Sequence, residues 1–269
     1  MSKILRAGGF ILFGIILILI FFGNKIIENI IFRPAKIEQS YVFKFNKPFK
    51  EFYVETDSGI RINVVRFPAK KAKGSLLYFH GNKDNLIRWG KIASQFTEYQ
   101  YNSYVFDYRG YGKSSGMPSE ESILKDSEVI FEKINQLYPD SCWIYFGRSL
   151  GSGVAAYLSS RYTPNGLILE SPYYSMEELI GRFYFPYTWY SQFVSLPSYA
   201  FLKDSSFPLL ILHGDYDQVV PVESGLKLFY TIKNPSKKIV IIKHGTHDNL
   251  SEYAEYQKEI GRASCRERV

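Results

Sequence analysis

The chain has 269 residues, of which 46% are hydrophobic and 22% charged, and its formal net charge is +7. This balance excludes a disordered chain, the length suits one large domain, and the scattered basic residues favour no nucleic-acid partner. Two cysteines are too few for a disulfide framework or a cysteine-rich metal site, and we expect neither a metal nor a cofactor.

The first predicted element is a membrane-directed segment near the N-terminus. An uncharged run from Phe10 to Phe22 follows Lys3 and Arg6, and its length lies at the lower limit for a spanning helix. No small-x-small cleavage site follows, so residues 1–33 are interpreted as a single-pass membrane anchor and its flank, with a cleaved secretory signal as the alternative. Basic residues on both sides of the run leave the sidedness of the anchor open.

Three segments rich in β-forming residues come next, at residues 41–45, 52–56 and 60–67. An Asp-Ser-Gly turn at residues 57–59 separates the last two. These segments are predicted to form an antiparallel lead-in to the sheet.

From residue 75 onward, short apolar runs alternate with longer helix-like stretches. The runs are predicted to be buried strands, at residues 76–79, 103–106, 143–146, 167–169, 209–212 and 239–242. Helices are predicted near residues 86–98, 119–137, 150–160, 222–233 and 248–258. Such alternation is typical of an α/β fold with a mostly parallel central sheet and helices on both faces.

The interval from residue 171 to residue 207 is longer than one crossover needs, and it is rich in aromatic residues. We interpret residues 173–206 as an inserted cap, with Phe183, Tyr187 and Trp189 as candidates for substrate binding. An aromatic cap favours an apolar acyl or aromatic substrate.

A serine flanked by glycines follows the third predicted strand of this series. Gly147, Ser149 and Gly151 make the pattern G-x-S-x-G between a strand and a helix. The small residues let strand and helix approach while a strained turn presents the serine hydroxyl. The pattern predicts Ser149 as a nucleophile, and a glycine-rich connecting turn is the alternative.

All four histidines lie at or just beyond the ends of predicted strands. His247, in the loop after the last strand, is predicted to take the serine proton and return it to the leaving group. His244 ends that strand directly and is expected to be structural. Asp217 is predicted to orient the imidazole of His247, with Asp215 and Glu170 as alternatives.

Two backbone N–H groups are predicted to hold the oxyanion of the reaction. One belongs to Leu150, directly after the nucleophile, and the other to Asn82, in the loop after the first strand of the series. His80, which ends that strand, is expected to be structural.

Six motifs follow one another along the chain, at residues 79–82 (FHGN), 107–112 (DYRGYG), 147–153 (GRSLGSG), 170–172 (ESP), 213–217 (HGDYD) and 245–247 (GTH). In this order they resemble the motifs of the α/β-hydrolases, and the chain is similar to the membrane-anchored α/β-hydrolase domain-containing proteins. The resemblance covers roughly residues 50–258 and implies, as in some members of the family, action on acylated proteins or lipids. The hydrolase domain is predicted at residues 34–258. Residues 259–269 look like translated adapter sequence and are left out of the fold prediction.

The predicted function is that of a serine hydrolase that cleaves an ester, a thioester or an amide of an acyl or lipid-like substrate near a membrane. Two alternatives stay open: a non-catalytic, membrane-tethered binding protein of the same fold, and an acyltransferase or lyase that uses the same acyl-enzyme. The glycines after Ser149 imitate a dinucleotide fingerprint, but they stand too far beyond the strand to bind a pyrophosphate. The sequence predicts no oligomeric state.

Overall fold

The computed structural model describes residues 28, 31–56, 59–183 and 194–262. Among these residues we find no helix with the length and apolar character needed to span a bilayer. The uncharged run of the predicted anchor, residues 10–22, lies outside the described residues.

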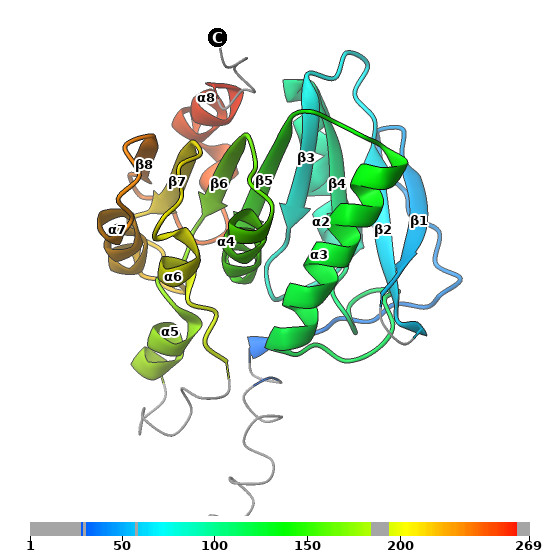
Figure 1. Cartoon of the computed structure of the whole chain (residues 1–269), viewed down its shortest axis with the longest axis horizontal. Coiled ribbons are helices and arrows are strands. Elements are labelled where there is room, and N and C mark those ends of the chain that lie inside the picture. Colours follow the sequence, from blue (N-terminus) through cyan, green and yellow to red (C-terminus); the bar gives the residue numbers. More distant parts are fainter. Residues whose placement is uncertain (1–27, 29–30, 57–58, 184–193, 263–269) are drawn as a thin grey trace, which may run out of the picture.

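An eight-stranded sheet forms the centre of the molecule, in the order β1-β2-β4-β3-β5-β6-β7-β8 (Figure 1). Strands β3 to β8 run parallel, whereas β1 pairs with β2 and β2 pairs with β4 in the antiparallel sense. The mostly parallel α/β fold is therefore confirmed, and so are the second and third segments of the predicted antiparallel lead-in, which form β1 and β2. The strands are β1 (Lys50–Glu55), β2 (Arg61–Phe67), β3 (Gly74–Phe79), β4 (Tyr101–Phe106), β5 (Trp143–Arg148), β6 (Gly166–Glu170), β7 (Leu209–Gly214) and β8 (Lys237–Ile242).

The strand predicted at residues 41–45 is wrong, because this segment is an irregular connection. Its alternating aromatic residues have a different cause: Phe43 is buried, Phe45 stacks on it at 5.5 Å, and Phe45 meets Phe67 edge-on at 5.1 Å. The rings bury themselves against β2 without a ladder of backbone hydrogen bonds. Backbone pairing in this region occurs earlier, where Lys36 bridges to Gly112.

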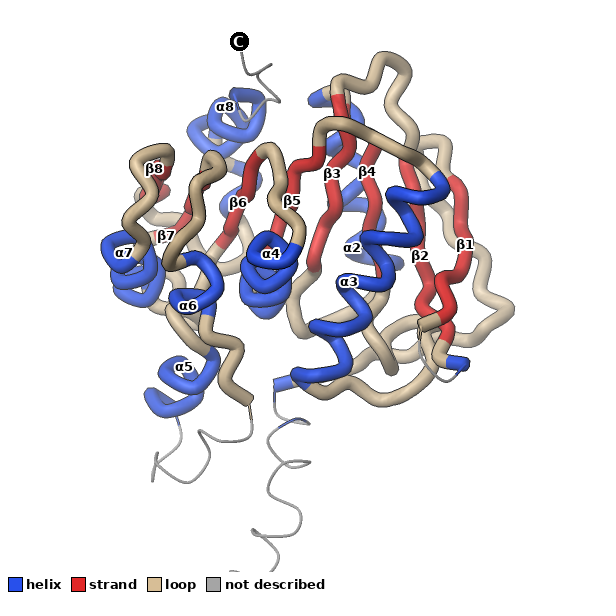
Figure 2. The backbone as a smooth tube through the Cα atoms, in the orientation of Figure 1, coloured by secondary structure: helices blue, strands red, loops and turns tan. Residues whose placement is uncertain are grey.

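Helices cover both faces of the sheet (Figure 2). On one face, α3, α4, α6 and α7 bury residues such as Ile130, Val154 and Leu228 in one core cluster. On the other face, α2 and α8 bury residues such as Trp89 and Tyr256 in a second cluster. The helices are α2 (Leu86–Ser94), α3 (Glu120–Leu137), α4 (Leu150–Arg161), α5 (Met176–Phe183), α6 (Ser198–Leu202), α7 (Val222–Thr231) and α8 (Ala254–Arg262), with short 3-10 helices at η2 (Gln95–Tyr99) and η4 (Leu250–Glu252).

The interval between β6 and β7 contains α5 and α6. Its central part, residues 184–193, lies outside the described residues, and so do Tyr187 and Trp189. Phe183 ends α5. The cap therefore stays a prediction, and so does the non-native origin of residues 259–269, although α8 continues to Arg262.

The direction in which successive strands are added to the sheet reverses between β3 and β5. These two strands are neighbours, but the chain leaves β3 toward β4 and leaves β5 toward β6, so the loops at their carboxyl ends diverge. In open parallel sheets a ligand crevice forms at such a point. The two diverging loops begin with His80 and Ser149.

Candidate active site

Ser149 occupies the turn between β5 and α4 in a strained conformation. Its φ of 51° and ψ of −119° lie outside the regions that most residues adopt, and such strain costs about 1–3 kcal/mol. Its N–H donates to the carbonyl of Glu170 at 3.0 Å. A Cβ atom on Gly151 would lie 2.1 Å from the carbonyl oxygen of Phe79, and one on Gly147 would lie 2.5 Å from that of Gly151. Glycine is therefore required on both sides of the turn.

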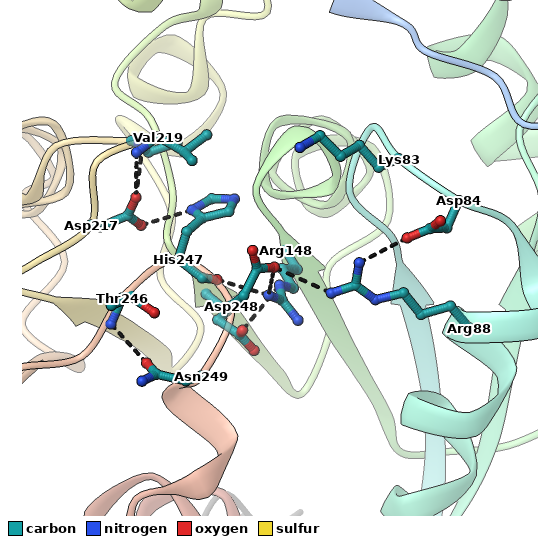
Figure 3. Close-up of polar contacts among 12 residues, drawn as sticks. Lys83, Asp84, Arg88, Arg148, Asp217, Val219, Thr246, His247, Asp248 and Asn249 are labelled. Atoms are coloured by element: carbon teal, nitrogen blue, oxygen red, sulfur yellow. Dashed lines mark hydrogen bonds and ion pairs between the residues drawn. The ribbon is translucent and has the colours of Figure 1, made fainter.

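His247 and Asp217 form a hydrogen-bonded pair (Figure 3). The Nδ1 atom of His247 lies 2.8 Å from Oδ2 of Asp217. The other carboxylate oxygen accepts the N–H groups of Val219 at 2.9 Å and Val220 at 2.8 Å. The carboxylate is thus held from both ends, which fixes the plane of the imidazole ring.

Burial alone would raise the pKa of the Asp217 carboxyl group. The hydrogen bond and charge of His247 and the N–H group of Val220 outweigh burial, so the pKa of Asp217 lies below its ordinary value. The carboxylate is therefore ionised at neutral pH, as an orienting group for a histidine must be.

The alternative carboxylates make other contacts. Oδ1 of Asp215 accepts the N–H of His244 at 2.5 Å and stabilises the turn after β8. Glu170 binds Arg148 at 3.2 Å and accepts the hydroxyl of Tyr256 at 2.8 Å. Asp217 is the carboxylate that the structure brings to His247.

The loop after β3 brings Asn82 to the same pocket as Ser149 and Leu150. The side-chain amide of Asn82 donates to the backbone carbonyl of Ile31 at 2.8 Å. The backbone carbonyl of Asn82 accepts a hydrogen bond from the hydroxyl of Tyr111 at 3.1 Å. Sequence patterns did not single out Ile31 and gave Tyr111, within the motif at residues 107–112, no such contact, because these contacts join segments far apart in the chain. They fix a loop that is predicted to bind an oxyanion.

His80 lies beneath this loop and is fully buried. Its ring packs on Tyr108 with centroids 4.2 Å apart, and its Nδ1 lies 2.6 Å from the carbonyl oxygen of Gly81. Burial lowers the pKa of His80 to about 4, so the ring is neutral at physiological pH. These contacts agree with a structural part for His80.

Two pockets meet at Ser149. The larger, of about 500 Å³, is mainly apolar and lies on the side of α5; it is lined by Ile31, Asn82, Ser149, Leu150, Tyr173, Met176, Leu179, Ile180, Gln218, Val219 and Val220. The smaller, of about 100 Å³, is more polar and includes Lys83, Arg88, Arg148, His247 and Asp248 in its wall. The arrangement places the predicted nucleophile between an apolar compartment and a polar one.

Comparison with known proteins gives matches over most of the chain. Residues 70–203 match the Hydrolase_4 family, described as serine aminopeptidase, S33. Protein R595 of Acanthamoeba polyphaga mimivirus is 30% identical over 229 residues, which cover 76% of this chain and 77% of that protein. The lysophosphatidylserine lipase ABHD12 of Rattus norvegicus is 34% identical over 186 residues, which cover 60% of this chain but only 46% of the lipase.

Solved structures share the fold at lower identity. The esterase Pf2001 of Pyrococcus furiosus superposes with a TM-score of 0.68 at 18% identity, covering 85% of this chain and 96% of the esterase. Est1E of Butyrivibrio proteoclasticus, solved with ferulic acid bound, gives a TM-score of 0.66 at 22% identity and covers 79% of this chain and 98% of that protein.

Proposed function

Because this chain belongs to the α/β-hydrolase family of serine hydrolases, we propose that it cleaves an ester or thioester through an acyl-enzyme on Ser149. The observation that carries the proposal is the hydrogen bond of 2.8 Å between His247 and Asp217, beside a pocket whose wall includes both Ser149 and His247. A serine, a histidine and a buried carboxylate in this chain order are the groups that acyl transfer requires.

Each group has one task in the proposed reaction. His247 takes the proton of the Ser149 hydroxyl as its oxygen attacks the acyl carbon, and Asp217 stabilises the imidazolium that forms. The N–H groups of Leu150 and Asn82 bind the oxyanion. His247 then returns the proton to the departing alcohol or thiol, and a water molecule, activated by the same histidine, releases the acid.

The apolar pocket supports an acyl chain as the group that is transferred. Its wall includes Met176, Leu179 and Ile180 on α5, and a cavity of about 500 Å³ exceeds what an acetyl group needs. The names of the relatives, a lipase and esterases, support an acyl ester of lipid-like character. The polar compartment on the other side of Ser149 is suited to the leaving group.

We predict that hydrolysis of p-nitrophenyl esters rises from the acetyl ester to chains of medium length. Each additional buried methylene group contributes about 0.8 kcal/mol, which corresponds to roughly fourfold in kcat/KM until the pocket is filled. Replacing Ile180 with tryptophan should abolish the preference for longer chains while the acetyl ester is still hydrolysed.

Tyr230→Trp is the matched control, since Tyr230 is highly exposed on α7, and this variant should keep the wild-type chain-length profile. A wild-type preference for the acetyl ester over every longer chain would refute the acyl-pocket assignment. Absence of hydrolysis for the whole series would count against the esterase itself.

We also propose that residues 10–22 anchor the enzyme in a membrane. Ile31, close behind this segment, lines the apolar pocket, so an anchor would bring the pocket near the lipid surface. The full chain should therefore stay in the membrane pellet after alkaline-carbonate extraction, and the double variant Leu17→Arg/Leu19→Arg should be released, since each arginine costs about 3 kcal/mol in a bilayer.

Release of the wild-type chain by carbonate would contradict the anchor. The mass of the pelleted protein distinguishes an uncleaved anchor from a processed signal, because a cleaved chain lacks its first residues.

A further inference from the structure

Arg148 is a buried cation directly beside the predicted nucleophile. It is the last residue of β5, it is 5% exposed, and it occupies the variable position before Ser149 in the G-x-S-x-G pattern. The reaction proposed above assigns it no task.

The guanidinium group of Arg148 joins three parts of the site, and Figure 3 shows its contacts with His247 and Asp248. Its Nε lies 3.2 Å from a carboxylate oxygen of Glu170, at the end of β6. Its Nη2 donates to the backbone carbonyl of His247 at 2.7 Å and to Oδ1 of Asp248 at 3.0 Å. One side chain thus connects the strand of the nucleophile with the loop of the general base.

The carboxylates of Glu170 and Asp248 compensate the charge of Arg148, and each carboxylate has a further partner of its own. Tyr256 donates to the second oxygen of Glu170 at 2.8 Å, and Arg88 contacts Asp248 at 3.2 Å. The guanidinium also lies over the ring of Trp89, 5.4 Å from its centroid. Burial disfavours the charge, but Glu170 and Asp248 outweigh it and raise the pKa of Arg148, so the cation persists.

Stability alone does not account for this cation. A buried ion pair is often no more stable than apolar side chains of the same size, because desolvation offsets the attraction. The contact that an apolar residue cannot replace is the hydrogen bond to the His247 carbonyl. His247 lies in an irregular loop between β8 and η4, so its position depends on such contacts.

We propose that Arg148 is a positioning residue that holds the backbone of the general base at a fixed distance from Ser149. Arg148 and Ser149 are adjacent at the end of one rigid strand. The hydrogen bond from the guanidinium therefore holds the His247 loop in a fixed position relative to that strand. The inference rests on the proposed function, since it assigns His247 as the base. A shift of about 1 Å in a reacting group can cost about 100-fold in rate.

The first test removes the cation without leaving a buried charge behind. In Arg148→Met/Glu170→Gln neither partner is charged, so we expect the protein to fold. Its kcat for a p-nitrophenyl ester should fall about 100-fold while KM changes by less than about threefold, because the substrate pockets are retained. Arg148→Lys, which keeps the charge but not the planar fork of donors, should have an intermediate kcat.

The matched control is a second arginine–carboxylate pair, in which Asp126 is buried and Arg109 is partly buried. Arg109 donates to Asp126 at 2.7 Å, and neither residue lines the two pockets at Ser149. Arg109→Met/Asp126→Asn should lower the melting temperature as much as the first double variant or more, with kcat per folded enzyme unchanged.

Chemical rescue separates positioning from a general structural effect. Arg148 forms part of the wall of the small polar pocket, so Arg148→Ala opens a space that a guanidinium ion can enter. Added guanidinium, below the concentration that unfolds the variant, should raise kcat, whereas urea at the same concentration should not. A fluorophosphonate titration measures the concentration of active sites, and each kcat is calculated per active site.

The positioning role is overturned if Arg148→Met/Glu170→Gln keeps the wild-type kcat, if the control pair loses as much kcat, or if guanidinium gives no rescue. These outcomes differ from failure of the proposed function. In that case the wild type would hydrolyse no ester of the series, or Ser149→Ala would hydrolyse the ester at the wild-type rate.

Discussion

Replacement of Ser149 with alanine is expected to abolish ester hydrolysis and labelling by a fluorophosphonate probe. Without the hydroxyl no acyl-enzyme forms, and loss of a nucleophile in a serine hydrolase lowers kcat by about 10⁶-fold. The folded structure should persist, because alanine can replace serine in the same space, and circular dichroism with thermal unfolding checks this. In-gel fluorescence and initial rates on a p-nitrophenyl ester measure the loss.

Ser159→Ala is the matched control. Ser159 is a buried serine of the same helix, α4, and its hydroxyl donates to the carbonyl of Ala156 at 2.7 Å, away from the turn. This variant should label and turn over like the wild type. Equal labelling of wild type and Ser149→Ala would exclude Ser149 as the nucleophile, whereas a wild type that neither labels nor turns over ester would favour a non-catalytic binding protein of the same fold.

Asp217→Asn should lower kcat by roughly 10⁴-fold with little change in KM. The carboxylate accepts the Nδ1–H of His247, whereas an amide can present its NH₂ group to the ring and stabilise the wrong tautomer. The amide also carries no charge to stabilise the imidazolium. Steady-state kinetics on the same ester, referred to labelled serine, measures the effect.

Asp215→Asn controls for the loss of a nearby carboxylate. Asp215 stabilises the turn at His244 and does not contact the imidazole of His247, so its variant should stay within about threefold of the wild-type kcat. A larger loss in Asp215→Asn than in Asp217→Asn would exchange the roles of the two residues.

The sequence predicted the strands of the parallel sheet well, because a buried strand has a local signal: a short run of β-forming apolar residues between helices. The error at residues 41–45 has the same origin. Alternating aromatic residues indicate that one side of an extended segment is buried, but they do not indicate whether its backbone has a strand to pair with. Whether the segment can pair depends on its neighbour β2, and both edges of β2 are already paired, with β1 and with β4.

The candidate site could be predicted where the strand-end rule applies. Ser149, Asp217 and His247 each follow a strand, and the carboxyl ends of parallel strands meet at one edge. Arg148 could not be found in this way, since a charged residue in a variable position suggests exposure. Its burial depends on Glu170 and Asp248, which only the folded chain brings to it.

The contact between Ile31 and Asn82 has a practical consequence for how this enzyme can be shortened. Ile31 and Phe32 are buried, and the carbonyl of Ile31 accepts the amide of Asn82. A chain that began at the first strand of the sheet would lack Ile31 in the wall of its pocket and one support of the loop after β3. A shortened chain should therefore begin upstream of Glu28, whose carbonyl accepts the N–H of Phe32 at 2.7 Å, so that Ile31 keeps its place in the pocket wall.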